Sequence, residues 1–207
     1  MLLAAVLALP ALPAAPAAAS PVGPDNFVIK DLGPYLWFYV PTCMAFLPDG
    51  RLLVGEKRGN VYLVKNSLKA SLPIWNGQNE VLNSGDCGLM SIAVDPSYFA
   101  NHYVYFLYTV DPDTNGVDSE MSGFGRLVRY QMSALDTNAI DLSSRTVLLG
   151  TDWAHGPLTT STHTVGSLRF GADGTLLVSS PLRMTAIFLG FTYPARCCFS
   201  SLLTLIT

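Results

Sequence analysis

A histidine near the C-terminal end of the chain could act as a proton acceptor. His163 lies in the segment THTVGSLRFGADGTLLVSS, residues 162–180, ahead of a phenylalanine and an Asp-Gly pair. Histidine has an ordinary pKa of about 6.5, so a neutral imidazole can accept a proton at neutral pH. The alternative is a hydrogen-bonded histidine that lines a channel without a catalytic role, and the residues alone favour it. We expect His102 and His155 to lie in solvated loops, and we assign them no role.

Two cysteines could form a disulfide. Cys43 and Cys87 each stand just ahead of an apolar stretch and are 44 residues apart. Equivalent positions in adjacent structural repeats can be neighbours, so a Cys43–Cys87 bridge is one expectation and two buried free thiols is the other. The chain has no C-x-x-C pair, and its four cysteines are distant in sequence from its three histidines. We therefore expect no metal site built from them.

The segment around His163 shares a pattern with an earlier part of the chain. Residues 46–54 and residues 170–178 both read F-x-x-D-G-x-L-L-V. An Asp-Gly pair between two short apolar runs is a strong indication of a β-hairpin, because glycine adopts the positive φ that a tight turn requires. Two copies of one hairpin indicate a repeat architecture.

Short β-strands account for most of the chain between the two ends. No segment shows a helical 3.6-residue period over three turns. The runs of β-forming residues separated by turn residues predict a series of antiparallel strands. We place these strands at residues 27–32, 43–48, 51–57, 61–64, 72–75, 89–94, 103–109, 125–132 and 145–149, and we expect a further hairpin over residues 170–178. Residues 111–122, 133–144 and 151–162 are predicted to be loops or linkers.

The strands and the repeat predict an all-β fold, a partial β-propeller. The hairpin pattern returns at a spacing that suits blades of four strands. Residues 27–180 leave room for two to three blades, whereas closed propellers have about four to eight. An immunoglobulin-like sandwich is the alternative, and the repeated hairpin and the lack of a Cys…Trp…Cys frame count against it. We expect Trp37, Trp75 and Trp153 to pack against other residues rather than to serve as sugar platforms.

The composition excludes one class of ligand. Half of the residues are hydrophobic, 13% are charged and the formal net charge is −3. The lysines and arginines are scattered, so no basic stripe is available to neutralise the phosphates of a nucleic acid. We therefore expect a small-molecule ligand rather than a nucleic acid.

Both ends of the chain differ from its middle. Residues 1–19, MLLAAVLALPALPAAPAAA, resemble a signal peptide cleaved after Ala19, which predicts a secreted protein. An uncleaved membrane anchor is the alternative, but prolines interrupt the apolar run, so no membrane association is expected. Residues 181–207 are apolar and lack strand and turn patterns, so we expect this tail not to belong to the fold, which then spans residues 27–180. A membrane or lipid-anchored tail is the alternative for that segment.

The chain from about residue 41 to residue 180 resembles the glucose/sorbosone dehydrogenase family. The resemblance rests on MAFLPDGRLLVGEKRGNVYLV, on GDCGLMSIAVDPSYFANHYVYFLYT and on HTVGSLRFGADGTLLVS. The middle block is the most specific, since F-x-x-D-G hairpins occur in many propellers. Members are secreted six-bladed propellers of the quinoprotein glucose dehydrogenase (TolB-like) type, and some are aldose dehydrogenases that depend on pyrroloquinoline quinone (PQQ). The resemblance therefore implies that this chain is an N-terminal part of such a propeller.

The resemblance also implies an activity. The enzymatic members oxidise a sugar at C1 with PQQ as hydride acceptor and with calcium, and His163 matches the position of their general base. Their quinone-binding residues and calcium ligands lie downstream of the segment matched here, so no cofactor-binding residue is assigned. A cofactor site assembled from several blades cannot form from these blades alone, so we expect this chain to bind neither PQQ nor calcium and to be inactive by itself.

Two positions depart from the family's enzymes. Thr162 stands where the enzymes often have an aspartate, and Asp86 stands where they often have a glutamine. In addition, Ser180-Pro181 replaces the Gly-Asp or Gly-Glu pair expected after the LLVS strand. These departures are compatible with an alternative function, a non-catalytic extracellular propeller that binds a protein ligand, similar to hedgehog-interacting protein.

Overall fold

Two Asp-Gly turns reverse the chain where the repeated pattern predicts them. Gly50 and Gly174 have φ of 88° and 82°, in the left-handed region that glycine adopts without strain. In each turn the aspartate side chain accepts a hydrogen bond from the backbone N–H two residues later, at 3.1 Å for Asp49 and 3.0 Å for Asp173. The turns join β1 (Pro41–Phe46) to β2 (Leu52–Glu56) and β11 (Leu168–Phe170) to β12 (Leu176–Ser179), so both predicted hairpins are confirmed.

The computed structural model describes residues 24, 27–29, 32, 36–114, 117–180 and 184–187, the last four by their backbone only. The predicted signal peptide over residues 1–19 lies outside the described residues. The chain divides into two compact units, residues 1–32 and 33–207. In the first unit the described residues form no strand, so the predicted strand at 27–32 is not found in those residues. All of the described strands belong to the second unit.

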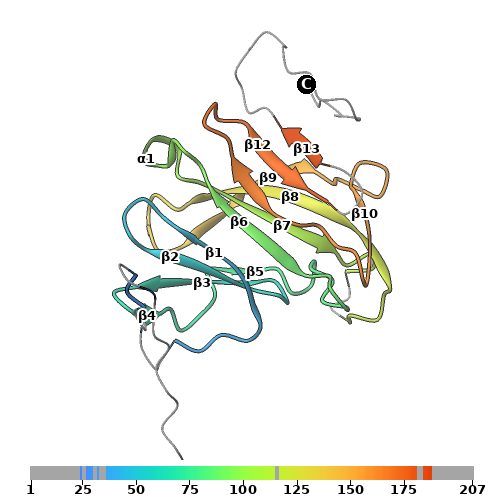
Figure 1. The fold of residues 1–207 in the computed structure, drawn as a ribbon, viewed down its shortest axis with the longest axis horizontal. Helices are drawn as coiled ribbons and strands as arrows, with labels where there is room; N and C mark the ends of the chain where they lie inside the picture. Colours follow the sequence, from blue (N-terminus) through green and yellow to red (C-terminus); the bar gives the residue numbers. More distant parts are fainter. Residues whose placement is uncertain are drawn as a thin grey trace, which may run out of the picture. The chain divides into compact units, whose positions relative to one another are not determined.

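Three antiparallel sheets make up the second unit (Figure 1). Sheet A contains β1, β2, β3 (Asn60–Lys65), β4 (Leu68–Lys69) and β5 (Trp75–Asn76). Sheet B contains β6 (Leu89–Val94), β7 (Tyr103–Val110), β8 (Ser122–Met132), β9 (Ile140–Leu149) and β10 (Leu158–Thr160). Sheet C contains β11, β12 and β13 (Met184–Ile187). A short helix, α1 (Tyr98–Asn101), lies between β6 and β7.

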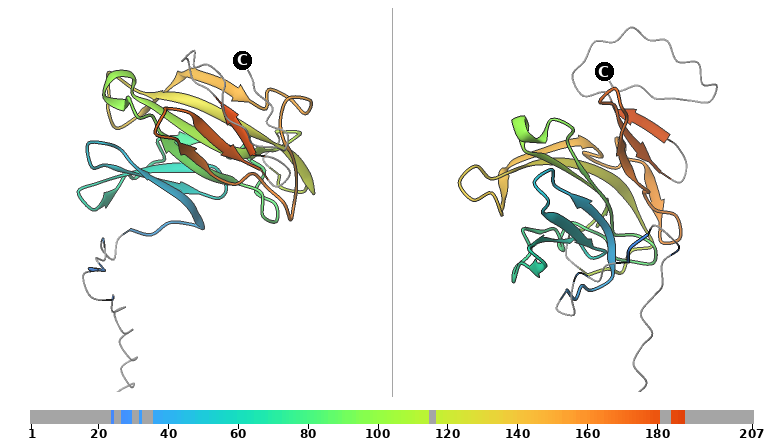
Figure 2. Two further views of the ribbon diagram at one scale, coloured as in Figure 1. Left: turned by 45° about the horizontal axis from the view of Figure 1, so that its top comes forward. Right: turned by 60° about the vertical axis from the view of Figure 1, so that its left-hand side comes forward.

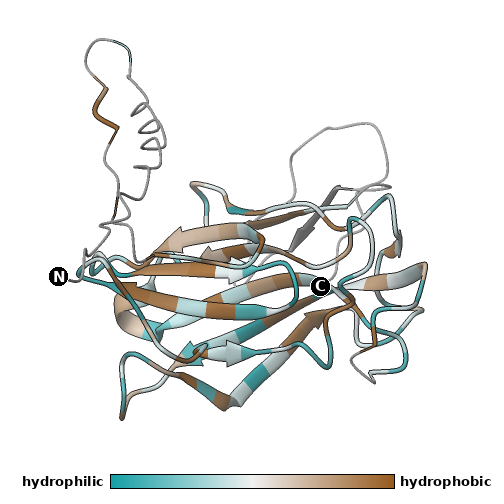
Figure 3. Cartoon of the chain, turned by 90° about the horizontal axis from the view of Figure 1, so that it is seen from below, coloured by the Kyte–Doolittle hydropathy of each residue, from teal (hydrophilic) through white to brown (hydrophobic). Residues whose placement is uncertain are grey.

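The central strands of sheet B are apolar on both faces. Phe106 and Val128 point to one face and pack in a core shared with sheet A, which includes Leu53. Leu107 and Leu127 point to the other face and pack in a second core with residues of sheet C. Because successive side chains of a strand point to opposite faces, a continuous apolar run predicts a sheet covered on both sides. Figure 3 shows this apolar colouring along the strands.

The three sheets follow one another along the chain and stack face to face. β1 of sheet A packs against β6 of sheet B, and β6 packs against β11 of sheet C. Each of these strands is the first of its sheet in sequence, and two further views show the sheets in succession (Figure 2). Consecutive antiparallel sheets stacked in this way are the blades of a propeller. The predicted all-β fold and partial β-propeller are confirmed.

Sheet A has a second apolar face, which is partly covered. Leu36 and Phe38 pack on Leu52 and its neighbours on this face. Met44 and Phe46 of β1 remain 69% and 65% exposed. The outer face of sheet A therefore differs from both faces of sheet B.

Several predicted boundaries need correction. Residues 133–144 were expected to be a linker, but β9 begins at Ile140 and pairs with β8. Its first half contains three polar residues, Asp141, Ser143 and Ser144, and β9 lies at the margin of the sheet, where it pairs only with β8 among the described strands. The expected loop at 151–162 contains the short strand β10, and the strand expected at 72–75 begins only at Trp75.

The fold also continues past Ser180. Met184–Ile187 forms β13, which pairs antiparallel with β12 from Leu176 to Ser179. The expectation that the fold ends at Ser180 therefore does not hold for these four residues, since backbone pairing does not depend on the polar and apolar pattern that the prediction used. The other residues of the predicted tail, 181–183 and 188–207, lie outside the described residues.

A carboxylate with two arginines cross-links the loop before β6 to sheet B. Glu80 Oε1 lies 2.5 Å from Arg126 Nη1, 2.6 Å from Arg145 Nη2 and 2.7 Å from the Tyr108 hydroxyl, which donates to it. Burial by itself would raise the pKa of Glu80, but the hydrogen bonds from Tyr108 and Arg126 and the charge of Arg145 together hold it below its ordinary value. The cluster therefore stabilises the ionised carboxylate in the folded state.

We predict that Glu80→Gln lowers the free energy of unfolding by about 2 kcal/mol at pH 7, because two arginines lose their countercharge in a partly buried site. Urea titration measures this. The folded-state pKa is depressed, so the contribution is complete above the ordinary carboxyl pKa of 4.5 and is lost as the pH falls through the folded-state value. The matched control is Asp152→Asn, which removes an exposed pair with His155 and should leave the free energy of unfolding unchanged within error. An equal effect of both variants would contradict the prediction.

Candidate functional site

His163 sits on a tight turn between β10 and β11. The Thr160 N–H donates to the His163 carbonyl at 2.8 Å, and the His163 N–H donates to the Thr160 carbonyl at 3.1 Å. This pair of backbone bonds forms an isolated antiparallel bridge, which fixes the turn. The imidazole is exposed, and its Nδ1 lies 3.0 Å from the Thr162 hydroxyl. The side chain is therefore held at its base and open to a ligand.

The turn that carries His163 is anchored to the loop that enters β6. The Asp86 N–H donates to the Ser161 carbonyl at 2.6 Å, and the Cys87 thiol donates to the Thr160 carbonyl at 3.2 Å. The Thr109 and Thr164 hydroxyls lie 2.8 Å apart and join the turn to β7. Residues far apart in sequence thus fix the position of His163.

The loops that enter the first strands of the sheets are hydrogen-bonded to one another through Lys57. The Lys57 N–H donates to the Val40 carbonyl at 2.9 Å, and the Lys57 carbonyl accepts from the Leu89 N–H at 2.7 Å. The Lys57 ammonium donates to the Asn83 side chain at 3.0 Å. Val40 adopts φ of 47°, which is an outlier for a β-branched residue. The entry to β1, the entry to β6 and the His163 turn therefore form one connected group of loops, which we call the entry-loop cluster: residues 39–40, 57–58, 83–88 and 160–164.

The charges of the entry-loop cluster do not suit a polycarboxylate such as PQQ. Asp86 is exposed within it, and Asn83 contacts Asp118 at 2.7 Å. In the described part of the chain, the cations of the cluster are Lys57, whose ammonium is bonded to Asn83, and Arg58, which lies over the Tyr39 ring at 5.3 Å. A ligand with several carboxylates needs cations free to pair with it. These residues alone therefore do not form a quinone site.

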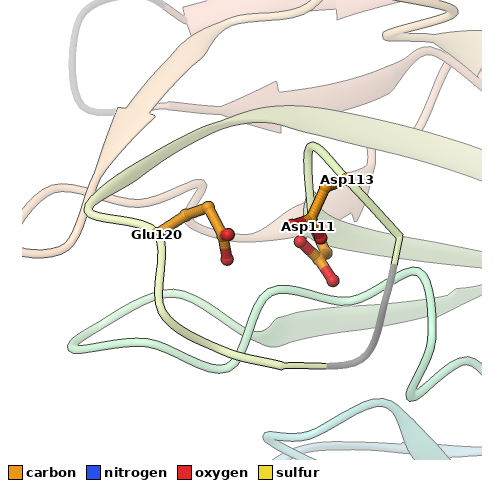
Figure 4. Close-up of side chains that lie close together, drawn as sticks. All are labelled: Asp111, Asp113 and Glu120. Carbon is orange, nitrogen blue, oxygen red and sulfur yellow. The ribbon is translucent and has the colours of Figure 1, made fainter.

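An acidic group lies in the loop between β7 and β8. Asp111, Asp113 and Glu120 each place one carboxylate oxygen within 4.8 Å of the others (Figure 4). Calcium takes about six to eight oxygen ligands, so three carboxylates could supply part of a site. No metal ligand was predicted from the sequence, although the D-P-D sequence at residues 111–113 was an available signal for this acidic group.

Cavities elsewhere in the described structure do not include His163. One, of about 440 Å³, is lined by residues such as Arg51 and Tyr98 near α1. Another, of about 540 Å³, is lined by residues such as Trp75 and Arg145 between sheets A and B. The candidate site is therefore an open surface at the entry-loop cluster.

The two cysteines are separate thiols. Cys43 and Cys87 are free, which is the second of the two alternatives that the sequence left open, and the expected disulfide is absent between them. Cys43 packs against the core between sheets A and B, whereas Cys87 bonds to the Thr160 carbonyl. Burial raises the pKa of the Cys43 thiol to about 11, so it stays protonated at neutral pH.

The other histidines and the tryptophans have different surroundings. His102 ends α1 and packs edge-on against Tyr98, and His155 pairs with Asp152 on the surface. Trp75 is buried and donates to the Tyr130 hydroxyl at 3.2 Å, as its predicted packing role requires. Trp37 and Trp153 are 71% and 44% exposed, and each meets the packing prediction only in part, through ring contacts with Tyr39 and Phe124 respectively. No helix among the described residues is long and apolar enough to span a membrane.

We predict that Gly85→Ala loosens the His163 turn. Gly85 has φ of 54°, and an added Cβ would collide with the Ser161 carbonyl oxygen. Hydrogen–deuterium exchange should rise in residues 160–164, because the Asp86 hydrogen bond to Ser161 would be displaced. Gly174→Ala is the matched control, since Gly174 has φ of 82° but no heavy atom within 4 Å of its added Cβ. Unchanged exchange in the turn of the Gly85 variant would contradict the prediction.

Solved structures of sugar dehydrogenases share this fold. The PQQ-bound aldose sugar dehydrogenase of Streptomyces coelicolor is 22% identical with a TM-score of 0.52, and the alignment covers 70% of this chain and 38% of that one. The apo aldose sugar dehydrogenase of Escherichia coli is 19% identical with a TM-score of 0.54, covering 69% and 38%. A structure described as glucose dehydrogenase is 21% identical with a TM-score of 0.56, covering 73% and 40%.

The chain spans about two fifths of the length of these solved structures. A comparison with curated protein sequences finds no match. The sequence model of the family "Glucose / Sorbosone dehydrogenase" matches residues 38–186, which include all three sheets from β1 to most of β13. The chain therefore belongs to the glucose/sorbosone dehydrogenase family.

Proposed function

We propose that this chain is part of a secreted quinone-dependent sugar dehydrogenase, in which His163 accepts a proton from the anomeric hydroxyl of an aldose. The observation that carries the proposal is the position of His163 in this chain, which belongs to the family. Its exposed imidazole lies on a turn that backbone hydrogen bonds fix within the entry-loop cluster. The apolar residues 1–19 support secretion.

The proposed chemistry assigns His163 one task. PQQ, when bound by a complete enzyme of this family, supplies the acceptor for the hydride that leaves C1. The imidazole removes the hydroxyl proton, and it can do so when a substrate oxygen approaches to about 2.6–3.2 Å. Its exposure leaves room for that approach, and the backbone bonds of the turn limit the motion of its Cα.

The proposal places the remaining components outside the described residues. The entry-loop cluster does not fit PQQ by itself, and the acidic group at residues 111–120 offers only part of a calcium site. We propose that further blades, in a propeller of six, supply the cations that hold the quinone. The comparisons support this assignment, because the alignments cover only 38% of each of these related dehydrogenases.

We predict that the purified chain alone reduces no electron-acceptor dye with glucose, PQQ and calcium. The reason is that the cations described in the entry-loop cluster, Lys57 and Arg58, already have partners and are not free to pair with the quinone carboxylates. Spectrophotometric dye reduction measures this, with the Streptomyces coelicolor enzyme as a positive control. Reduction that depends on added PQQ would show that the chain forms a complete site.

We predict that His163→Gln removes the activity of a chimera in which residues 36–187 replace the matched segment of the Streptomyces coelicolor enzyme. Loss of the base should lower kcat by about 10²–10⁴-fold. His155→Gln is the matched control and should leave kcat unchanged, because the His155 side chain pairs with exposed Asp152 on the surface. A chimera that binds PQQ but keeps its kcat after His163→Gln would refute the assignment, and one that folds without binding PQQ would favour the protein-binding alternative.

A further inference from the structure

We infer that the Thr162 hydroxyl holds His163 in the tautomer with its proton on Nδ1, so that Nε2 carries the free lone pair. The inference rests on the proposed function, which decides between the two directions of the Thr162–His163 hydrogen bond and requires Nε2 as the base. It assigns Thr162 a positioning role rather than a catalytic one. The tautomer itself can be measured on this chain without any activity.

Three side-chain atoms are placed in a row on the His163 turn. The Thr162 Oγ1 lies 3.0 Å from His163 Nδ1, and the Thr160 Oγ1 lies 3.4 Å from the Thr162 Oγ1. A threonine hydroxyl has one proton and two acceptor lone pairs. When Thr162 donates its proton to Thr160, it can only accept at Nδ1. The row then runs from the Nδ1–H of His163 to the Thr162 hydroxyl and on to the Thr160 hydroxyl.

The opposite direction would leave no basic nitrogen available. If Thr162 donated to Nδ1, the imidazole proton would sit on Nε2 and the Nδ1 lone pair would already be engaged. The ring could then accept a proton only after that hydrogen bond broke. In the direction that we infer, Nε2 takes up a proton while Thr162 continues to accept from Nδ1–H, so no hydrogen has to reorient.

The backbone keeps this row of atoms in place. The Thr160 carbonyl accepts hydrogen bonds from both the His163 N–H, at 3.1 Å, and the Cys87 thiol, at 3.2 Å. The Thr160 N–H is bonded to the His163 carbonyl at 2.8 Å. The three residues therefore stay close even though their side chains are exposed. Selection of a histidine tautomer by the hydrogen bond at the other ring nitrogen is a general property of the side chain.

The test is two-bond ¹H–¹⁵N NMR of the full chain with labelled histidine, at about pH 8.5, where an ordinary imidazole is neutral. We expect His163 to show the proton on Nδ1. In Thr162→Val, which keeps the shape and removes the hydroxyl, the ratio should move toward Nε2–H. Thr162→Ser keeps the hydroxyl and should behave as the wild type, and His102 and His155 serve as internal references in each spectrum. A wild-type His163 with its proton on Nε2, or a ratio unaffected by Thr162→Val, would overturn the inference.

The dehydrogenase chimera separates this inference from the proposed function. If both hold, Thr162→Val should lower kcat by about tenfold with little change in KM, and Thr162→Ser should restore it. If the NMR result holds while His163→Gln leaves kcat unchanged, the tautomer assignment stands and the base assignment fails. If the NMR ratio does not respond to Thr162→Val, the inference fails whether or not His163 is the base.

Discussion

The middle sheet of the chain has to be covered on both faces, and the other parts of the fold follow from this need. Phe106 and Val128 require sheet A on one side, while Leu107 and Leu127 require sheet C on the other. Burial of apolar area is the main source of stability in such a stack. Since the strands that come first in each sheet pack against one another, the loops that enter them gather together, and His163 is among them.

The sequence predicts the strands best where the pattern of residues and the local turn agree. The Asp49-Gly50 and Asp173-Gly174 turns were predicted correctly because a tight hairpin depends on a glycine with positive φ, which is a local property. The second half of β9 was predicted correctly as a strand at residues 145–149, whereas its first half was missed because Asp141, Ser143 and Ser144 are typical of a polar linker. The pairing of β13 was missed for a related reason, since backbone hydrogen bonds between strands leave little trace in side-chain composition.

The candidate site, like the fold, was predicted only in part from the sequence. The resemblance to the family over HTVGSLRFGADGTLLVS identified His163. Nothing in the sequence reveals that its turn is hydrogen-bonded to Asp86 and Cys87, which lie more than 70 residues earlier. The two free cysteines also have different surroundings, because the Cys87 thiol bonds to the turn while Cys43 packs against the core. Contacts between distant loops depend on how the sheets stack, and a single sequence read by itself shows no pattern that predicts them.

The order of the sheets along the chain has a consequence for how the protein is made. Each sheet is a local meander that can form as it leaves the ribosome, and the sheet synthesised next covers the face that it leaves open. Sheet B can dock on sheet A while sheet C is still being translated. The face of sheet A that carries Met44 and Phe46 is different, because no later sheet among the described residues covers it. Among the described residues, this face therefore remains an apolar surface after the three sheets have stacked.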